Sequence, residues 1–221
     1  MRANKPFAAF TIGLMLIGAN GFALAAGQIG QWRAGVNYNL LAAPQAPTVP
    51  SGKVEVSEVF WYGCGHCYTL DPVLDDWKSK KAPYIEFVRV PVIWGPLHQQ
   101  HAKLYYTLLA LGKPELHAKV FDAIHKEHQA LADRDELKAR EMHFAFLSRH
   151  GVTRERFDAS YDSLTVMTNV RRAAALTQNY QVGNVPMIFV NGKYSTGVSE
   201  AGGVQQLLSL MNDLAASEKN R

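Results

Sequence analysis

WYGCGHCY at residues 61–68 is the most informative stretch of this chain, because it contains the only two cysteines, Cys64 and Cys67. Such a pair can form a structural disulfide, bind a metal or exchange disulfides with other proteins. Closing so short a loop would restrict the unfolded chain by only about 2 kcal/mol, against about 3 kcal/mol for a loop of about fifteen residues. The pair is therefore a poor structural crosslink, which leaves metal binding and redox chemistry.

Metal binding is the first of these two alternatives. Covalent attachment of haem requires Cys-x-x-Cys-His, and Tyr68 stands where that histidine would be. A zinc site could add two histidines at HxxH spacing, which puts both rings on one helical face. The candidates are His98 and His101, or His125 and His128. We expect all four on solvated helical faces, and we predict neither a metal nor another cofactor.

The residues around the cysteines indicate a strand followed by a helix. Residues 53–61 alternate with period two and are rich in valine and aromatic residues, which predicts a buried strand. From Cys64 to Lys80, apolar residues recur at helical spacing, and Pro72 is tolerated if the helix begins near Cys64 or bends at the proline. Cys64 is thus expected at a helix N-terminus, where free N–H groups and the helix dipole stabilise a thiolate.

These features favour disulfide exchange, in which a thiolate is the nucleophile. We predict Cys64 as the nucleophile and Cys67, one helical turn further on, as a less exposed resolving thiol. His66 can lower the pKa of Cys64 by its charge or by a hydrogen bond; otherwise it is an exposed loop residue. A Cys64 pKa of about 4 would stabilise the reduced form by about 4 kcal/mol and raise the reduction potential by roughly 90 mV.

Glu58 is the candidate proton carrier for Cys67. Period two places it on the same strand face as Val54, Val56 and Phe60, among apolar neighbours. A buried carboxylate is costly unless it has a partner or a function. We predict that Glu58 moves a proton to and from Cys67. The alternatives are an edge residue that reaches solvent and a partner in a structural ion pair.

The chain resembles the DsbA-type thiol:disulfide oxidoreductases. The resemblance rests on the strand–CGHC–helix arrangement and on VGNVPMIFVNGKY at residues 182–194. It covers essentially the whole chain after residues 1–25. It implies a thioredoxin fold interrupted by a helical domain. It also implies that Cys64 is the exposed nucleophile, Cys67 its buried partner, His66 the histidine that stabilises the thiolate, and Glu58 the buried acid.

The resemblance assigns four further positions. Pro186 matches the proline that follows a cis peptide bond and packs against the disulfide, although an ordinary trans bond is the alternative from the residue alone. Val185 and Gly65 are expected at the substrate-binding surface, and Asp71 falls where some members have a second acid. Gly65 replaces the proline of the best-known DsbA oxidases, and CGHC is also the motif of protein disulfide isomerases, at about −180 mV against about −120 mV for DsbA.

The start of the chain has the pattern of a cleaved signal peptide. Arg2 and Lys5 precede an uncharged apolar run, and residues 23–25 offer a cleavage site with small residues. An uncleaved anchor is the alternative. Cleavage would lower the formal net charge from +4 to +2. The chain shows no arginine-rich stripe with interleaved aromatic residues, so nucleic-acid binding is not expected.

The predicted fold class is α/β, a thioredoxin-like fold with a helical domain inserted between the core strands. Further strands are predicted at 84–92 and 185–190, a hairpin turn at 191–192, and a closing helix at 202–219. In the helical stretch, Leu137, Phe144 and Leu147 are expected to share a buried face. The predicted domains are 1–25 as signal peptide, 26–97 with 172–221 as the thioredoxin-like domain, and 98–171 as the helical domain.

The predicted function is that of a periplasmic oxidase. It would donate the Cys64–Cys67 disulfide to reduced, unfolded secreted polypeptides through a mixed disulfide, act as a monomer, and be recharged by a membrane quinone reductase like DsbB. Two alternatives remain open. One is a periplasmic disulfide reductase or isomerase on the same fold, and the other is a non-catalytic module that binds metal or peptide.

Overall fold

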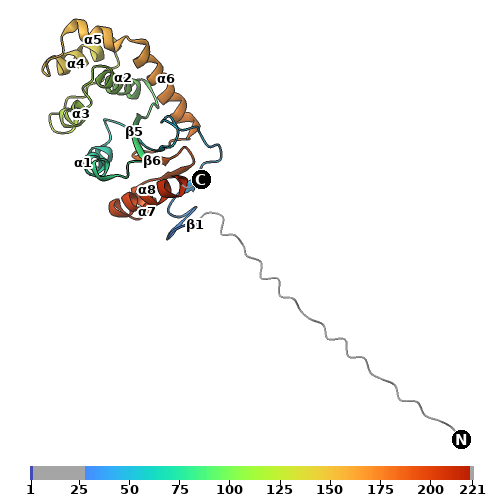
Figure 1. Cartoon of the computed structure of the whole chain (residues 1–221). Helices are drawn as coiled ribbons and strands as arrows, with labels where there is room; N and C mark the ends of the chain where they lie inside the picture. Colours follow the sequence, from blue (N-terminus) through green and yellow to red (C-terminus); the bar gives the residue numbers. More distant parts are fainter. Residues whose placement is uncertain (2–27, 220–221) are drawn as a thin grey trace.

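The structure of the chain is a computed structural model, which describes Met1 and residues 28–219 (Figure 1). Apart from Met1, the predicted signal peptide at residues 1–25 lies outside the described residues. Within the described part, no helix is both long enough and apolar enough to span a membrane. This part consists of a sheet flanked by helices, with a group of further helices at one end of the sheet.

A five-stranded mixed sheet forms the centre of the molecule. The strands lie in the order β3 (Asn39–Leu40), β7 (Tyr194–Thr196), β6 (Met187–Val190), β4 (Val54–Phe60) and β5 (Ile85–Pro91). Only β4 and β5 run parallel within this sheet. Every residue of β4 is buried because helices cover both faces, which confirms the buried strand predicted at 53–61. The predicted strands at 84–92 and 185–190 are confirmed as β5 and β6.

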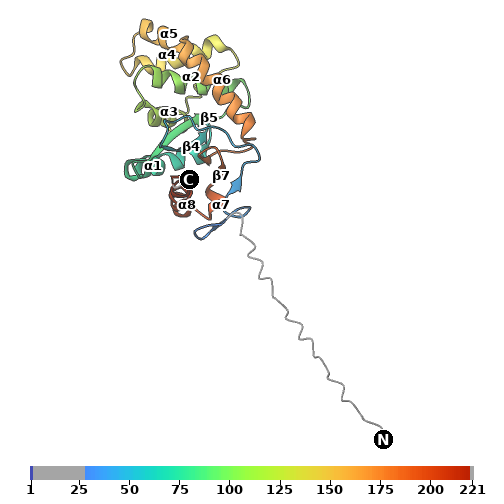
Figure 2. The ribbon, with the colours of Figure 1, turned by 45° about the vertical axis from the view of Figure 1, so that its right-hand side comes forward.

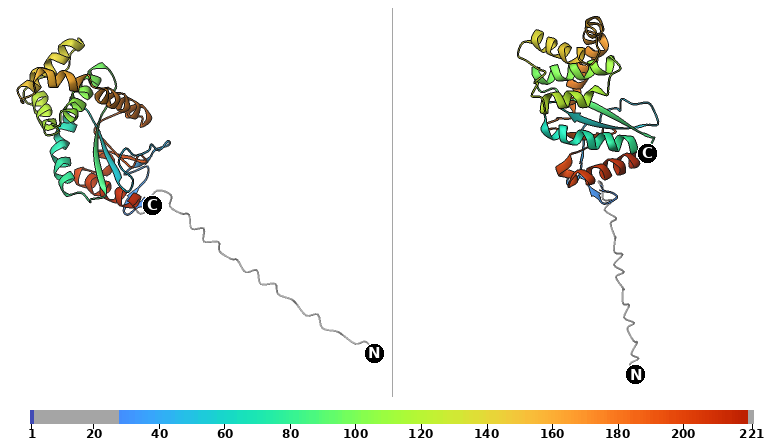
Figure 3. Two further views of the ribbon diagram at one scale, coloured as in Figure 1. Left: turned by 45° about the horizontal axis from the view of Figure 1, so that its top comes forward. Right: turned by 90° about the vertical axis from the view of Figure 1, so that its left-hand side faces the viewer.

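Helices pack on both faces of the sheet. On one face, α1 (Gly65–Lys80) and α8 (Val204–Lys219) share an apolar cluster with β4 and β6, and they lie side by side in Figure 3. On the other face, α6 (Leu164–Asn179) packs Ala173 against Val59 and Phe189. The short helix α7 (Val198–Ala201) precedes α8. A hairpin of β1 (Gln28–Ile29) and β2 (Trp32–Arg33) lies against α8 through a hydrogen bond from Trp32 to Asp213.

The remaining helices gather at one end of the sheet, as Figures 1 and 2 show. They are α2 (Pro96–Ala110), α3 (Leu116–His125), α4 (Glu136–Ser148) and α5 (Arg154–Tyr161). Helix α6 begins in this group and continues to Asn179 beside the sheet, past the expected domain boundary at residue 171. The apolar cluster of these helices includes Phe60 and Cys67. The helical group therefore closes over the strand and the helix that carry the cysteine motif.

The predicted apolar face of α4 is partly wrong. Leu137 is 74% exposed and Phe144 is half-buried, whereas Leu147 is buried together with Ala139, His143 and Phe146. Leu137 lies in the first turn of α4, two residues after the capping residue Asp135, and there its side chain points away from the neighbouring helices. Helical periodicity identified the helix but not the orientation of this first turn.

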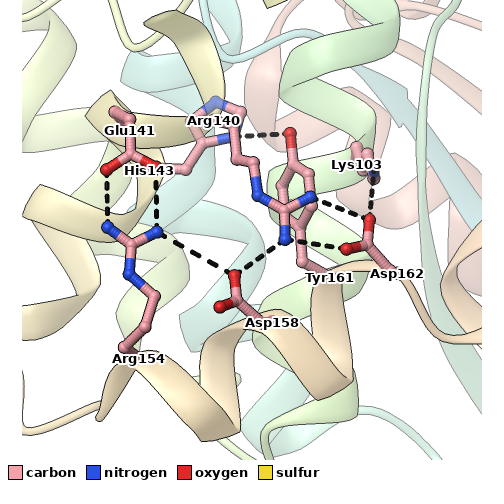
Figure 4. A network of polar contacts seen from close by, with 8 residues as sticks. All are labelled: Lys103, Arg140, Glu141, His143, Arg154, Asp158, Tyr161 and Asp162. Carbon is pink, nitrogen blue, oxygen red and sulfur yellow. Dashed lines mark hydrogen bonds and ion pairs between the residues drawn. The ribbon is translucent and has the colours of Figure 1, made fainter. Parts of the chain in front are cut away.

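Charged side chains tie α5 to α4 and α2 (Figure 4). Arg140 lies 2.7 Å from a carboxylate oxygen of Asp158 and 2.7 Å from one of Asp162. Beside this ion-pair network, the Nδ1 atom of buried His143 lies 3.3 Å from the hydroxyl of Tyr161. Exposed ion pairs stabilise a fold by up to about 1 kcal/mol each, so the apolar cluster supplies most of the stability of this end.

Replacing Gly192 with alanine tests the close approach of two chain segments at the turn after β6. Gly192 has a φ of +63°, and a Cβ atom there would lie 1.9 Å from the carbonyl oxygen of Gln45. We expect Gly192→Ala to lower the free energy of unfolding by about 3 kcal/mol or more, because the backbone has to move. Gly112→Ala is the matched control, since Gly112 has a φ of +68° with no atom within 4 Å.

The control variant should lose about 1 kcal/mol, the cost of a left-handed conformation alone. Denaturant unfolding of the two variants measures both losses. Equal losses would contradict the contact with Gln45.

Candidate active site

Cys64 caps the N-terminus of α1. Its backbone is extended, and its sulfur accepts a hydrogen bond from the backbone N–H of Cys67 at 3.3 Å. The helix begins at Gly65, as predicted, because the loop that follows β4 turns there with a hydrogen bond from Cys64 N–H to the Trp61 carbonyl at 3.0 Å. Both cysteines are free thiols; Cys64 is partly exposed and Cys67 is fully buried. The two sulfurs therefore have different access to solvent and to partners.

The two thiols also differ in their tendency to ionise. The hydrogen bond from the Cys67 thiol is the largest cause that lowers the pKa of Cys64, to about 6. Burial opposes it, and backbone hydrogen bonds from Cys67 and His66 and the charge of His66 lower the pKa further. His66 itself is exposed. The pKa of Cys67 is raised, first by its hydrogen bond to Cys64 and then by burial. At neutral pH, Cys64 is mainly a thiolate and Cys67 a thiol.

Glu58 is buried beneath the cysteines. Its side chain is 1% exposed and lies 3.1 Å from the Nε atom of Arg89, which pairs with it from the neighbouring strand. Burial raises the pKa of Glu58 to about 7, and the positive charge of Arg89 opposes this shift. The negative charge of Glu58 in turn raises the pKa of Cys67. Glu58 therefore has no access to solvent, has an ion-pair partner, and can gain or lose a proton near neutral pH.

Arg89 connects Glu58 to two carboxylates of α1. Its Nη2 atom lies 2.6 Å from Asp71 and 3.0 Å from Asp75. Asp71 is buried, whereas Asp75 is half exposed. Sequence reasoning did not predict Arg89 as a site residue. The available signal was an arginine within the apolar strand at 84–92, because a buried arginine requires an acidic partner.

The segment before β6 lies next to Cys64. The peptide bond between Val185 and Pro186 is cis, and the Cys64 thiol is 3.5 Å from the carbonyl oxygen of Val185. The structure thus brings Val185 and Pro186, predicted from a segment more than a hundred residues away, to the cysteines. Gly65 is exposed at the start of α1, and a side chain there would meet open space.

A hollow of about 430 Å³ extends from the cysteine motif between α1, the segment before β6, and α7. Its apolar surface comes from Leu70, Val73, Pro186 and Val198, and His66 stands at its edge. The hollow therefore presents an apolar surface next to the cysteine motif and Val185.

The prediction that the four HxxH histidines lie on solvated faces is wrong for His101. This residue is 4% exposed, and its Nε2 atom lies 2.8 Å from the carbonyl oxygen of Ala130. His125 is half-buried, with its Nε2 atom 2.8 Å from the carbonyl oxygen of Tyr62. Among the residues that the structure describes, no group of three or more histidine, cysteine or acidic side chains could hold a metal ion.

The geometry defines a class of protein. A free cysteine caps a helix that follows a central strand, a second cysteine lies buried one turn further on, and a cis proline segment contacts the first. A low-pKa thiol poised beside a buried one is the arrangement of a thiol:disulfide oxidoreductase. The surrounding sheet with its inserted helices is a thioredoxin fold.

Comparisons with known proteins agree with this class. Residues 86–211 match the DSBA-like thioredoxin domain family. The chain is 37% identical to the thiol:disulfide interchange protein DsbA of Pseudomonas aeruginosa strain PAO1, over 93% of this chain and 94% of that protein. It is also 37% identical to DsbA of Azotobacter vinelandii, over 79% of each chain.

Solved structures show the same relationship. The crystal structure of Pseudomonas aeruginosa DsbA covers 86% of this chain and 95% of its own length, with a TM-score of 0.77 and 37% sequence identity. DsbA from Xylella fastidiosa covers 85% of this chain and 98% of its own length, with a TM-score of 0.76 and 26% identity. The chain belongs to the DsbA-like thioredoxin family. It is a thiol:disulfide oxidoreductase of the DsbA type.

Titration of the Cys64 thiolate tests the origin of its low pKa. Because the contact with Cys67 is the largest cause and His66 a smaller one, Cys67→Ala should raise the pKa of Cys64 more than His66→Leu does. The measurement is thiolate absorbance near 240 nm against pH in the reduced protein, with an expected wild-type midpoint of about 6. An unchanged midpoint in His66→Leu would remove this histidine from the site, and an unchanged midpoint in Cys67→Ala would contradict the contribution of the Cys67 thiol.

Proposed function

We propose that this chain is an exported oxidase that donates the Cys64–Cys67 disulfide to reduced, unfolded secreted polypeptides. The observation that carries the proposal is the asymmetry of the two thiols: the Cys64 sulfur accepts a hydrogen bond at the N-terminus of α1, whereas Cys67 is completely buried. A stabilised Cys64 thiolate favours the reduced enzyme, and this makes its disulfide a better oxidant.

Exchange proceeds in two steps in this proposal. A substrate thiolate attacks the Cys64 sulfur and forms a mixed disulfide, while the bond between Cys64 and Cys67 breaks and Cys67 leaves with the electron pair. A second substrate thiolate then attacks the substrate sulfur of the mixed disulfide and releases the Cys64 thiolate. The substrate loses two electrons and the enzyme gains them. Since Cys64 leaves easily as a thiolate, the second step is favoured.

Glu58 serves as the proton donor and acceptor for Cys67 in this scheme. Cys67 leaves as a thiolate whose pKa is raised, so it takes up a proton. Glu58 has a pKa of about 7 and lies close enough for its charge to affect Cys67. When the enzyme is recharged, the Cys64 thiolate first forms a mixed disulfide with the oxidising partner. Cys67 then gives its proton to the Glu58 carboxylate, attacks the Cys64 sulfur and releases the partner's thiolate. A group with a pKa near the working pH suits both directions.

The substrate chain is proposed to bind in the hollow beside Pro186. The Val185 carbonyl and the neighbouring backbone can pair with an extended peptide, because Val185 precedes the residues of β6 that pair within the sheet and lines the hollow. Gly65 leaves room above Cys64 for the incoming thiol. This site needs no cofactor, since the two cysteines carry the electrons themselves.

The cellular setting is proposed from the leader and from the family. Residues 1–25 would direct export and be removed, and the mature chain would act in the periplasm as a monomer. A membrane quinone reductase like DsbB would reoxidise the cysteines. Residues 26–97 and 172–221 would form the thioredoxin-like domain and residues 98–171 the helical domain, with α6 bridging the two.

Serine variants of the two cysteines test this function. Toward a reduced, unfolded secreted protein, Cys64→Ser should lose all oxidising activity. Incubated with the same protein in its disulfide form, Cys67→Ser should accumulate a mixed disulfide, because the Cys64 thiolate attacks the substrate disulfide and no Cys67 thiol is present to release the adduct. Non-reducing electrophoresis and mass spectrometry detect the adduct, and Ser148→Ala, on the exposed side of α4, is the control that should behave as wild type. Substrate binding without any covalent adduct would instead support a binding module.

A further inference from the structure

His117, which sequence reasoning did not select, joins the buried charges beneath the cysteines from the helical domain. It lies in the first turns of α3 and is 4% exposed. Its Nδ1 atom is 2.8 Å from the hydroxyl of Tyr62, and its Nε2 atom is 3.2 Å from Asp71. The second contact is bent, because the ring N–H does not point straight at the carboxylate oxygen. The Nε2–H dipole attracts the charge of the Asp71 carboxylate at short range, without forming a hydrogen bond.

The surroundings determine which ring nitrogen of His117 carries the proton. Burial lowers the pKa of His117, so the ring is neutral at neutral pH. Burial raises the pKa of Tyr62 well above its usual value, so its hydroxyl keeps its proton. A hydroxyl that donates to Nδ1 leaves the hydrogen on Nε2, which faces the carboxylate of Asp71. In this tautomer the Nε2–H of His117 lies on the side of Asp71, with Nε2 3.2 Å from the carboxylate, without forming a hydrogen bond to it.

This dipole affects which of the two buried carboxyl groups, Glu58 or Asp71, binds a proton. Arg89 lies between the buried carboxylates of Glu58 and Asp71, and it keeps its own proton. One guanidinium cannot fully compensate two buried carboxylates, so one of them takes up a proton most readily. Asp71 lies 3.2 Å from the His117 Nε2 atom in addition to its pairing with Arg89, whereas Glu58 is paired with Arg89. The added dipole stabilises the negative charge on Asp71 and leaves the proton to Glu58.

We propose that His117 is a positioning residue for disulfide exchange: by stabilising the charge on Asp71, it makes Glu58 the carboxyl that exchanges a proton with Cys67. This inference rests on the proposed role of Glu58. In the oxidising direction, the substrate thiolate forms a bond to the Cys64 sulfur, the bond from Cys64 to Cys67 breaks, and the Cys67 thiolate takes the proton from the Glu58 carboxyl. The resulting Glu58 carboxylate is then paired with Arg89.

Other charged and titratable groups face this network from every neighbouring element. They are Glu58 on β4, Tyr62 and Cys67 around the motif, Asp71 and Asp75 on α1, Arg89 on β5, and Tyr105 on α2. Arg89, His117 and Lys78 line a hollow of about 160 Å³.

The test follows the carboxyl protons directly. In the reduced protein labelled with ¹³C at its carboxyl groups, NMR titration gives the midpoint of Glu58. His117→Leu should move the Glu58 midpoint to lower pH by about half a pH unit or more, because the negative charge on Asp71, which raises the pKa of Glu58, is then less stabilised. His117→Gln keeps an N–H donor near Asp71 and should restore the wild-type midpoint.

His143→Leu is the matched control. His143 is also buried in the helical domain between a tyrosine hydroxyl and an oxygen, the carbonyl oxygen of Leu131, but it lies outside this network. Replacing His143 should leave the titration midpoint of Glu58 unchanged. If His117→Leu does not fold, His117→Asn replaces it, since the shorter side chain can reach Tyr62 but not Asp71. An unchanged midpoint in the folded variant, or an equal shift in His143→Leu, would overturn the inference.

A kinetic readout separates this inference from the role of Glu58 itself. The rate at which glutathione reduces the Cys64–Cys67 disulfide should show an inflection near pH 7 that Glu58→Gln removes and His117→Leu moves to lower pH. If Glu58→Gln leaves the inflection in place, the proposed role of Glu58 fails. If Glu58→Gln removes it and His117→Leu leaves it where it was, only the role of His117 fails.

Discussion

The contact of Cys67 with the Cys64 sulfur, made by the Cys67 thiol and by its backbone N–H at 3.3 Å, is the one on which the rest of the site depends. It exists because Cys64 caps α1 and Cys67 lies in the first turn, where backbone N–H groups have no partner within the helix. The same turn places the Cys67 side chain in the core and the Cys64 side chain at the surface. One backbone arrangement thus produces both a stabilised thiolate and a buried thiol.

Cys67 is buried near the carboxylate of Glu58, and this buried charge needs a partner. Glu58 lies in the fully buried strand β4 next to apolar residues, and Arg89 from the adjacent parallel strand compensates its charge. The helical domain completes this arrangement, because its apolar cluster packs on Phe60 and Cys67 and its helix α3 brings His117 to Asp71. The inserted domain is therefore part of the redox site as well as a cover for it.

Sequence patterns were sufficient for the features that depend on neighbours in the chain. Period two predicted the buried strand with Glu58, helical spacing predicted α1, and the CGHC motif together with the resemblance predicted that Cys64, Cys67 and Pro186 belong to one site. Contacts between distant segments were not predictable in this way. The pairing of Arg89 with Glu58 depends on strand register, and the burial of His101 and the contact of His117 with Asp71 depend on how helices pack.

The thiolate is less stabilised than a pKa of about 4 would make it. With a Cys64 pKa of about 6, the reduced form gains about 1 kcal/mol at pH 7 once solvent screening is allowed for, or roughly 20 mV. This gain is present above the usual thiol pKa and is lost as the pH falls through about 6. The site therefore favours an oxidant of moderate strength, in keeping with Gly65 in its motif.

The reduction potential tests the oxidising direction most directly. The mature protein is equilibrated with glutathione redox buffers and followed by tryptophan fluorescence, because Trp61 lies three residues before Cys64 and Trp77 lies on α1. The account predicts a potential at or above about −180 mV, so that disulfides flow from this protein to its substrates. A potential near −270 mV, typical of thioredoxin, would contradict it and would mean that the protein reduces its partners.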